Sequence, residues 1–268
     1  MFFPVLVAGT FAAAAMGYLG VFVIFKRVAL AGDALSHVAL PGIALALALG
    51  VDVLWGAVPV LLLAAVAVYF ISKSAHLYED AIIGILFSLS LAVGVLFINL
   101  QDLEAALFGD ILHLGRMEIA VTVLLSFAIL ISVRVLHRSL ALSSFSADLA
   151  RANGVSVEKT NFLFFVLLAL AVALGVKVVG TLLVGSLVII PSSAASNVAK
   201  SLKSLTTFSV SFAVLSTGLG LVAADFYRVL PGPMIVIFEG VLFLLTFTAK
   251  LAHERARRPA PPNEPASR

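Results

Sequence analysis

The stretch that decides the fold class is VVGTLLVGSLVIIPSSAASNVA, residues 178–199. It contains no charged side chain, and about 20 mostly apolar residues are enough for an α-helix to cross a bilayer. Three further uncharged runs of similar length occupy residues 53–72, 81–101 and 204–224. The sequence therefore predicts an all-α polytopic membrane protein.

The composition of the chain excludes several other classes of protein. Hydrophobic residues make up 62% and charged residues only 12%, whereas soluble domains average about 25% charged residues. The chain has no cysteine, which excludes thiolate metal sites, disulfides and thiol catalysis. Basic residues flank the apolar runs, so the net charge of +3 does not indicate a nucleic-acid partner. No Gly-x-x-x-x-Gly-Lys-Ser/Thr loop occurs, and an ATP-driven process would need an ATPase on another polypeptide.

Hydropathy predicts nine spans within a transmembrane domain of residues 1–250, the first of them at the N-terminus. The runs at residues 160–176 and 178–196 are separated only around Lys177 and Gly180. They could instead form one long broken helix, which would reduce the total to eight spans. Residues 251–268 are basic and Pro-rich, which is typical of a disordered tail. The expected spans are residues 4–25, 34–51, 53–72, 81–98, 117–134, 160–176, 178–196, 205–224 and 231–250.

The distribution of basic residues predicts the orientation, because cytoplasmic loops of membrane proteins carry an excess of Lys and Arg. With the N-terminus outside and alternating spans, all but three of the 17 basic residues fall in inner segments. The exceptions are Arg116, Lys177 and Arg228. We expect Lys177 to extend along its span to the outer surface, and the C-terminal tail to be cytoplasmic.

A candidate metal site lies in GDALSH, residues 32–37, where an apolar segment begins. Asp33 and His37 are four residues apart, so on a helix their side chains share one face. A carboxylate and a neutral imidazole together bind divalent first-row metals. Ionisable residues are costly within a membrane, so those that are present usually serve a function. The alternative is structural: Asp33 caps a helix that starts there, and His37 is a partner inside the bundle.

Other residues in the apolar segments also invite a functional interpretation. Asp110 and His113 are three residues apart and are candidates to contact the ion or a binding protein at the outer mouth, as part of a possible outer gate like that of the related permeases described below. The structural alternative is that Asp110 caps the turn after Gly109. Glu239 lies in the middle of the last span and is expected to face the bundle, either in structural packing or along a pathway. Pro191 lacks a backbone donor and is expected to break its span.

Four motifs follow one another along the chain: FVIFKR (22–27) with GDALSH (32–37), LFGDIL (107–112), DLA (148–150) with Gly154, and VGTLLV (179–184) continuing through Pro191 and Ala194. In this order and spacing they resemble the motifs of the metal-type ABC transporter permease family. This family supplies the membrane subunits of bacterial zinc, manganese and iron importers, which are distant relatives of the cobalamin and siderophore permeases. In the outer loop at residues 227–233, the acidic residue that the family often has before a Pro is absent.

The resemblance implies a fold like that of the cobalamin-type permeases and an ATP-driven import function. A homodimer in the bacterial plasma membrane would take a divalent ion, most often zinc or manganese, from an extracytoplasmic binding protein. Cytoplasmic ATPase subunits would drive the cycle, Asp33 and His37 would meet the transported ion, and no cofactor would be permanently bound. The segment that docks on the ATPase would comprise Pro191, Ser192, Ser193, Ala194, Ala195, Asn197 and Lys200. An ion-gradient-driven transporter and a non-transporting scaffold or sensor are the alternatives.

Overall fold

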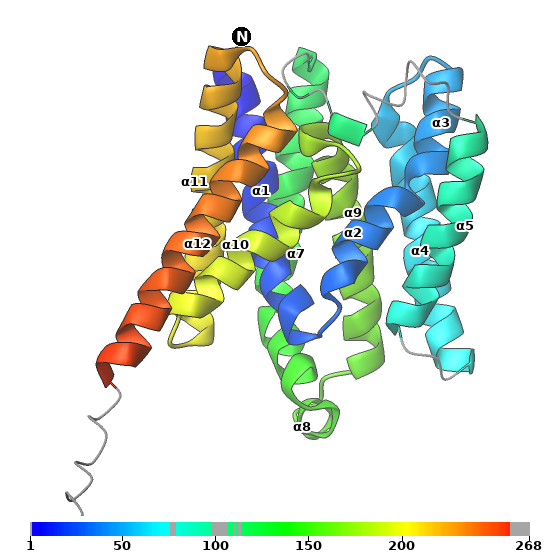
Figure 1. The fold of residues 1–268 in the computed structure, drawn as a ribbon. Helices are drawn as coiled ribbons and strands as arrows, with labels where there is room; N and C mark the ends of the chain where they lie inside the picture. Colours follow the sequence, from blue (N-terminus) through cyan, green and yellow to red (C-terminus); the bar gives the residue numbers. More distant parts are fainter. Residues whose placement is uncertain (1, 76–78, 98–106, 110, 112–113, 258–268) are drawn as a thin grey trace, which may run out of the picture.

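The computed structural model describes residues 2–75, 79–97, 107–109, 111 and 114–257. Within these residues the regular structure is helical and contains no strand, as predicted. Figure 1 shows the helices as an upright bundle, with the N-terminus and the last helical residues at opposite ends. The helices are α1 (Phe2–Phe25), α2 (Ala29–Val38), α3 (Leu40–Ala48), α4 (Val53–Ala75), α5 (Glu79–Phe97), α7 (Arg116–Phe145), α8 (Ala147–Ala152), α9 (Val157–Val179), α10 (Val184–Val198), α11 (Leu202–Tyr227) and α12 (Pro231–Arg257).

Seven helical segments of the described residues are long and apolar enough to cross a membrane. One of them, Ala29–Ala48, is formed jointly by α2 and α3, and the others correspond to α1, α4, α7, α9, α11 and α12. Two of the nine predicted spans appear as shorter apolar helices, Ala81–Phe97 and Val184–Val198. The polytopic helical architecture is thus confirmed, and α9 and α10 are separate helices instead of one.

Helix α1 forms the centre of the bundle, packed against α7, α9, α10 and α11. Its middle is rich in alanine and glycine, and small residues let helix backbones approach closely in a membrane protein. At Gly20, for example, a Cβ atom would lie only 2.0 Å from the carbonyl oxygen of Val188 in α10. The small side chains of α1 therefore determine how closely α10 approaches the centre.

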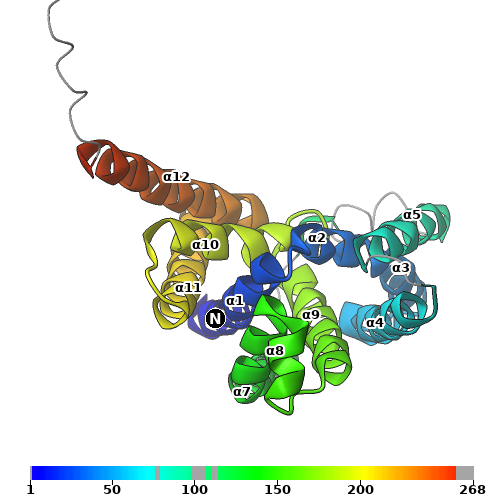
Figure 2. The same cartoon turned by 90° about the horizontal axis from the view of Figure 1, so that it is seen from below.

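Four helices follow one another along one side of the molecule. Seen from below, α12, α10, α2 and α5 form a row, and α7 and α8 lie on the opposite side (Figure 2). Contacts between neighbouring helices agree with this view, since α10 packs against both α12 and α2, and α2 packs against α5. This row carries the candidate residues Asp33, His37 and Glu239.

The spans that contain Pro41 and Pro191 respond differently to their proline. Pro41, near the start of α3, has no N–H to donate to the carbonyl of His37, and the helix turns at Ala39. Pro191 was expected to break its span, but this prediction is wrong: α10 continues through it to Val198. The Ser192 hydroxyl donates to the carbonyl oxygen of Val188, one turn back on α10, at 2.8 Å.

Several predicted boundaries also need correction, and the largest difference is at the end of α7, which runs to Phe145 and not to residue 134. Helix α2 begins at Ala29, several residues before the predicted span, because Val28 ends the turn that follows α1. Asp33 therefore lies inside a helix and does not cap one. Helix α12 runs to Arg257, past the predicted boundary at residue 250, because alanine, leucine, glutamate and arginine there favour a helix that leaves the membrane.

Candidate metal site

The structure places Asp33 and His37 one turn apart on α2, so the predicted sharing of one helix face holds. Both side chains are half-buried. The His37 ring stands edge-on to Phe87 of α5, with 5.3 Å between the ring centroids. Its Nδ1 atom is buried and has no hydrogen-bond partner among the described residues, so a nitrogen donor remains available. A carboxylate and a free imidazole nitrogen fit a divalent transition metal.

One chain offers an incomplete ligand set. No group of three or more His, Cys, Asp or Glu side chains that could hold a metal occurs in the part of the chain that the structure describes. A structural zinc site has four protein ligands, whereas a site that releases its ion needs fewer. The geometry of Asp33 and His37 therefore suits transient binding better than permanent retention.

Asp33 lies directly against α10. A Cβ atom at Gly185 would be 2.8 Å from the Cβ of Asp33 and 3.0 Å from its Oδ1. Only glycine allows this approach without displacing the carboxylate. The position of Asp33 is therefore coupled to the position of α10.

The polar side chain between the two candidate ligands fixes α2 to the connection between α9 and α10. The Ser36 hydroxyl is fully buried and lies 2.6 Å from the carbonyl oxygens of both Asp33 and Thr181, either of which can accept its hydrogen. Thr181 belongs to the four-residue connection that starts at Gly180. Ser36, which had no predicted role, thus links two of the sequence motifs.

A third motif meets the same connection. Gly180 has a φ of 83°, which favours glycine, and a Cβ atom there would lie 2.1 Å from the carbonyl oxygen of Leu107. The N–H of Leu182 donates to this same oxygen at 3.1 Å. Motifs at residues 32–37, 107–109 and 179–184 therefore meet in space although they are far apart in the sequence. The candidate gate residues Asp110 and His113 themselves lie outside the described residues.

Glu239 is buried in α12, as expected for a carboxyl group in the middle of a span. Only 1% of the residue is exposed, and neither carboxyl oxygen has a hydrogen-bond partner among the described residues. The Ser186 hydroxyl of α10 lies close by, but it donates to the carbonyl of Leu183 at 2.6 Å. The expected packing against the bundle is present, and a hydrogen-bonded partner is not.

The segment predicted to dock on an ATPase is mostly the second half of α10. Pro191, Ser192, Ala194 and Ala195 are buried within this chain, and Ser193 is half-buried. Asn197 donates to the Thr246 hydroxyl of α12 at 3.3 Å. Lys200, in the turn that follows α10, is exposed. The surface that this segment leaves open to another protein is therefore its end, around Lys200.

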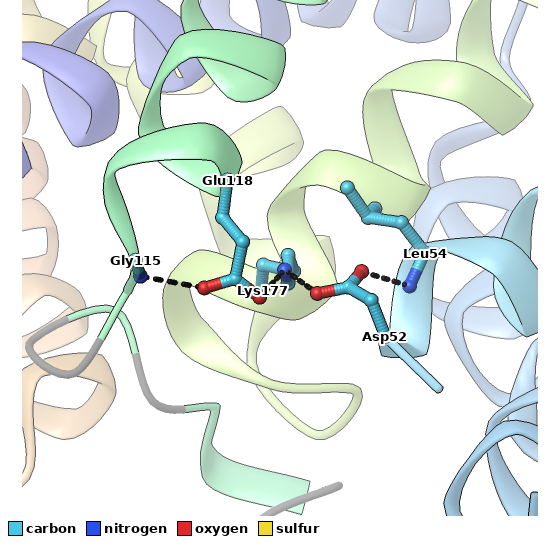
Figure 3. A network of polar contacts seen from close by, with 5 residues as sticks. All are labelled: Asp52, Leu54, Gly115, Glu118 and Lys177. Carbon is cyan, nitrogen blue, oxygen red and sulfur yellow. Dashed lines mark hydrogen bonds and ion pairs between the residues drawn. The ribbon is translucent and has the colours of Figure 1, made fainter. Parts of the chain in front are cut away.

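A charged network that the sequence did not reveal lies at the other end of the bundle (Figure 3). Lys177 was expected to reach the surface, and this is wrong: only 7% of its side chain is exposed. Its ammonium group forms ion pairs with Asp52, just before α4, and with Glu118 of α7, the latter at 2.8 Å. The Leu54 N–H donates to Asp52 at 2.8 Å, and the Gly115 N–H donates to Glu118 at 2.6 Å. The lysine is buried because two carboxylates, each held by a backbone donor, converge on it.

The same network determines the charge state of Asp52. Burial on its own raises the pKa of this carboxyl group, but contacts with Glu118 and Lys177 and the Leu54 N–H together hold its pKa below the ordinary value. Asp52 is therefore ionised at neutral pH. The ion pairs hold the α3–α4 turn and the start of α7 against α9.

Comparisons with known proteins agree with this architecture. The ABC 3 transport family model matches residues 1–250. The chain is 35% identical to the manganese import system permease protein ScaB of Streptococcus parasanguinis, over 86% of this chain and 84% of that protein. It is 32% identical to the high-affinity zinc uptake system membrane protein ZnuB of Haemophilus influenzae, over 91% and 95%. Among solved structures, PsaBC from Streptococcus pneumoniae in complex with Fab has a chain that matches with a TM-score of 0.83 and 32% identity, over 95% of this chain and 94% of that one.

Proposed function

The chain belongs to the ABC 3 transport family, and we infer that it is the membrane-spanning permease subunit of an ATP-driven metal importer. It is a transport component of the plasma membrane and not an enzyme, and ATP is hydrolysed by a separate ATPase polypeptide. Manganese and zinc are the cargoes named for its relatives, and a carboxylate with an imidazole suits both ions. Iron fits the same donors.

We propose that Asp33 and His37 bind the ion during its passage. The observation that carries this proposal is the pair itself: two donors one turn apart on a helix, with one donor nitrogen unpartnered and the carboxylate pressed against α10. Two ligands per chain bind the ion weakly enough to release it.

We further propose a homodimer in which α2 of each copy faces a shared pathway. A second copy would bring its own aspartate and histidine to the pathway, and either this second pair or water would complete the transient coordination of the ion. The row of α12, α10, α2 and α5 along one side of the molecule supports this arrangement, since it brings the candidate ligands to one side of the chain (Figure 2). The partners would be this second copy, the ATPase subunits and an extracytoplasmic binding protein.

The proposed topology has nine spans, an outer N-terminus and a cytoplasmic C-terminus. Chain ends on opposite sides of the bundle require an odd number of crossings, which favours nine spans over eight (Figure 1). The end of the bundle that carries Lys26, Arg27, Arg151 and Lys200 then faces the cytoplasm, where basic residues are preferred. The ATPase would dock at this end around Lys200.

The remaining candidates receive more limited roles. We propose that Asp110 and His113 contribute to the outer gate, because the adjacent residues of their motif pack against Gly180 at the end opposite Lys200. We assign Glu239 to packing between α12 and α10 and not to ion binding, because its own chain encloses it almost completely.

Transport by variants in a reconstituted system tests the proposal. The permease, its ATPase and its binding protein are placed in liposomes, and ATP-dependent uptake of manganese and of zinc is measured. We expect Asp33→Ala and His37→Ala each to reduce uptake at least tenfold, while basal ATP hydrolysis shows that the complex still assembles. His253→Ala, an exposed histidine near the end of α12, is the matched control and should leave uptake unchanged. Normal uptake in both pathway variants would refute the assignment.

A further inference from the structure

A polar cavity lies at the end of the bundle opposite the Lys177 network, between the ends of α1, α7 and α9. Its volume is ≈ 630 Å³, and the polar residues that line it are Lys26, Arg27, Ser143, Ser144 and Asn161. Neither the proposed metal pathway nor the Lys200 region uses these residues. The Lys26 and Arg27 cations and the N–H groups of the Asn161 amide are donors of the kind that recognise a phosphate group. The hydroxyls of Ser143 and Ser144 donate to the Leu140 carbonyl of their own helix.

Arg27 holds a conformation that glycine usually provides. The N–H of Arg27 donates to the carbonyl of Ile24 at 3.0 Å, and the N–H of Val28 donates to that of Val23 at 3.1 Å. This pair of bonds is the Schellman motif, in which the residue after the helix has a positive φ and is most often glycine. Arg27 has a φ of 60°, and Arg228 is the one other non-glycine residue with a positive φ in the described part of the chain.

An arginine in this conformation is less favourable for the backbone than glycine, and the guanidinium group is the feature that glycine would lack here. Within the described residues Arg27 forms no ion pair with a carboxylate. It is exposed and lines the cavity, where a guanidinium can bind two oxygens of one phosphate group. Strained residues of this kind cluster at ligand sites.

The wall of the cavity positions the second cation and adds an apolar surface. The Lys26 ammonium donates to the Asn161 side-chain oxygen at 2.6 Å and lies 5.5 Å from the centre of the Phe164 ring. The rings of Phe25 and Phe145, whose centroids are 5.4 Å apart, also line the cavity. A cationic site beside aromatic side chains at the ends of membrane helices suits a ligand with both a charged and an apolar part.

We propose that this cavity binds a phosphate-bearing anion, and that the occupant it favours is the headgroup of an anionic phospholipid from the cytoplasmic leaflet. Basic pockets between transmembrane helices on that side of a membrane bind such headgroups. The aromatic wall distinguishes a lipid from free inorganic phosphate, which would gain nothing from it. The lipid would hold the ends of α1, α7 and α9 together.

Binding to the purified permease–ATPase complex in a zwitterionic detergent tests the site. Thermal unfolding is followed while dioctanoyl phosphatidylglycerol, dioctanoyl phosphatidylcholine or inorganic phosphate is added. We expect phosphatidylglycerol to stabilise the wild type at lower concentration than phosphatidylcholine does. Arg27→Gly and Lys26→Gln should each weaken this binding about fivefold.

The control uses the second strained arginine. Arg27→Gly removes the guanidinium but relieves the backbone, so the variant folds, and Arg228→Gly does the same at the far end of α11, away from the cavity. Arg228→Gly should keep the affinity of the wild type for phosphatidylglycerol. Equal affinity in wild type and Arg27→Gly overturns the anion site. If inorganic phosphate stabilises the wild type as strongly as phosphatidylglycerol does, and Arg27→Gly loses both effects, the anion site stands and the lipid assignment is overturned.

Discussion

Gly185 of α10 packs so closely against Asp33 of α2 that a Cβ atom at Gly185 would lie 2.8 Å from the Cβ of Asp33. This contact joins the proposed ligand to the helix whose other end leads to Lys200, the region we assign to the ATPase. A shift of α10 cannot leave Asp33 in place, because the two backbones are in contact at this point. The structure thus contains a direct connection between α10, whose far end we propose to meet the ATPase, and the proposed metal ligand Asp33.

Replacing this glycine tests the connection. In Gly185→Ala the added methyl group must displace the Asp33 side chain or separate α2 from α10. Overpacking of this kind costs about 1–3 kcal/mol, and we expect metal uptake to fall more than tenfold because the carboxylate is moved from its position. Uptake in liposomes and thermal stability in detergent are the measurements.

Gly84→Ala in α5 is the matched control, since a Cβ atom there meets nothing within 4 Å. Alanine is favoured over glycine in a helix, so Gly84→Ala should be at least as stable as the wild type and should transport normally. Full uptake by Gly185→Ala would show that the close approach is not needed for transport.

The buried lysine of α9 gives a second prediction. Lys177→Met leaves Asp52 and Glu118 without their cation, and we expect a loss of about 1–3 kcal/mol in stability. This is less than the 3–5 kcal/mol for fully buried pairs because 35% of the Glu118 side chain is exposed. Lys73→Met breaks an ion pair whose side chains are 59% and 61% exposed, and it should cost less than about 1 kcal/mol. Thermal unfolding of both variants measures the difference, and an equal effect would contradict the structural role of Lys177.

The pH dependence of stability follows from Asp52. Its pKa in the folded protein lies below the ordinary value of about 3.9, so the unfolded chain takes up the proton first as the pH falls. The stabilising contribution of Asp52 is therefore fully present above about pH 5, and is lost as the pH falls through the ordinary pKa and then through the folded one. We expect the difference in melting temperature between wild type and Asp52→Asn to be constant from pH 7 to about pH 5 and to shrink below about pH 4. If the difference in melting temperature instead grew as the pH fell, the pKa of Asp52 would be raised in the folded protein and not lowered.

How much of this structure the sequence predicts depends on how far apart the interacting residues are along the chain. The apolar runs give the spans, and the i, i+4 spacing correctly places Asp33 and His37 on one helix face, because both depend on local periodicity alone. Pro191 shows where local reasoning fails: a proline interrupts a helix in isolation, but α10, which packs closely against Gly20 of α1, continues through it. Pro41 also lacks the N–H that would bond to the preceding turn, but there the helix does turn, at Ala39.

Contacts between distant segments could not be predicted in this way. Lys177 is 125 residues from Asp52 and 59 from Glu118, so nothing local distinguishes it from a lysine that reaches the surface. The contact between Ser36 and Thr181, which are 145 residues apart, likewise could not be predicted from the sequence. The one available signal was that isolated acidic residues, Asp52 and Glu118, occur at the same predicted membrane boundary as Lys177.

Glu239 allows the packing role and a pathway role to be separated. An ionised carboxylate without a partner in a membrane interior is very costly, so we expect the side chain to be neutral. Glu239→Gln has the same shape and no charge, and it should keep both stability, within about 1 kcal/mol, and uptake. Glu239→Leu replaces two unsatisfied oxygens by methyl groups and should be as stable as the wild type or more so. Thermal unfolding and liposome uptake are measured together for both variants. Stable variants that no longer transport would assign Glu239 to the ion pathway, because packing alone does not depend on the carboxyl group.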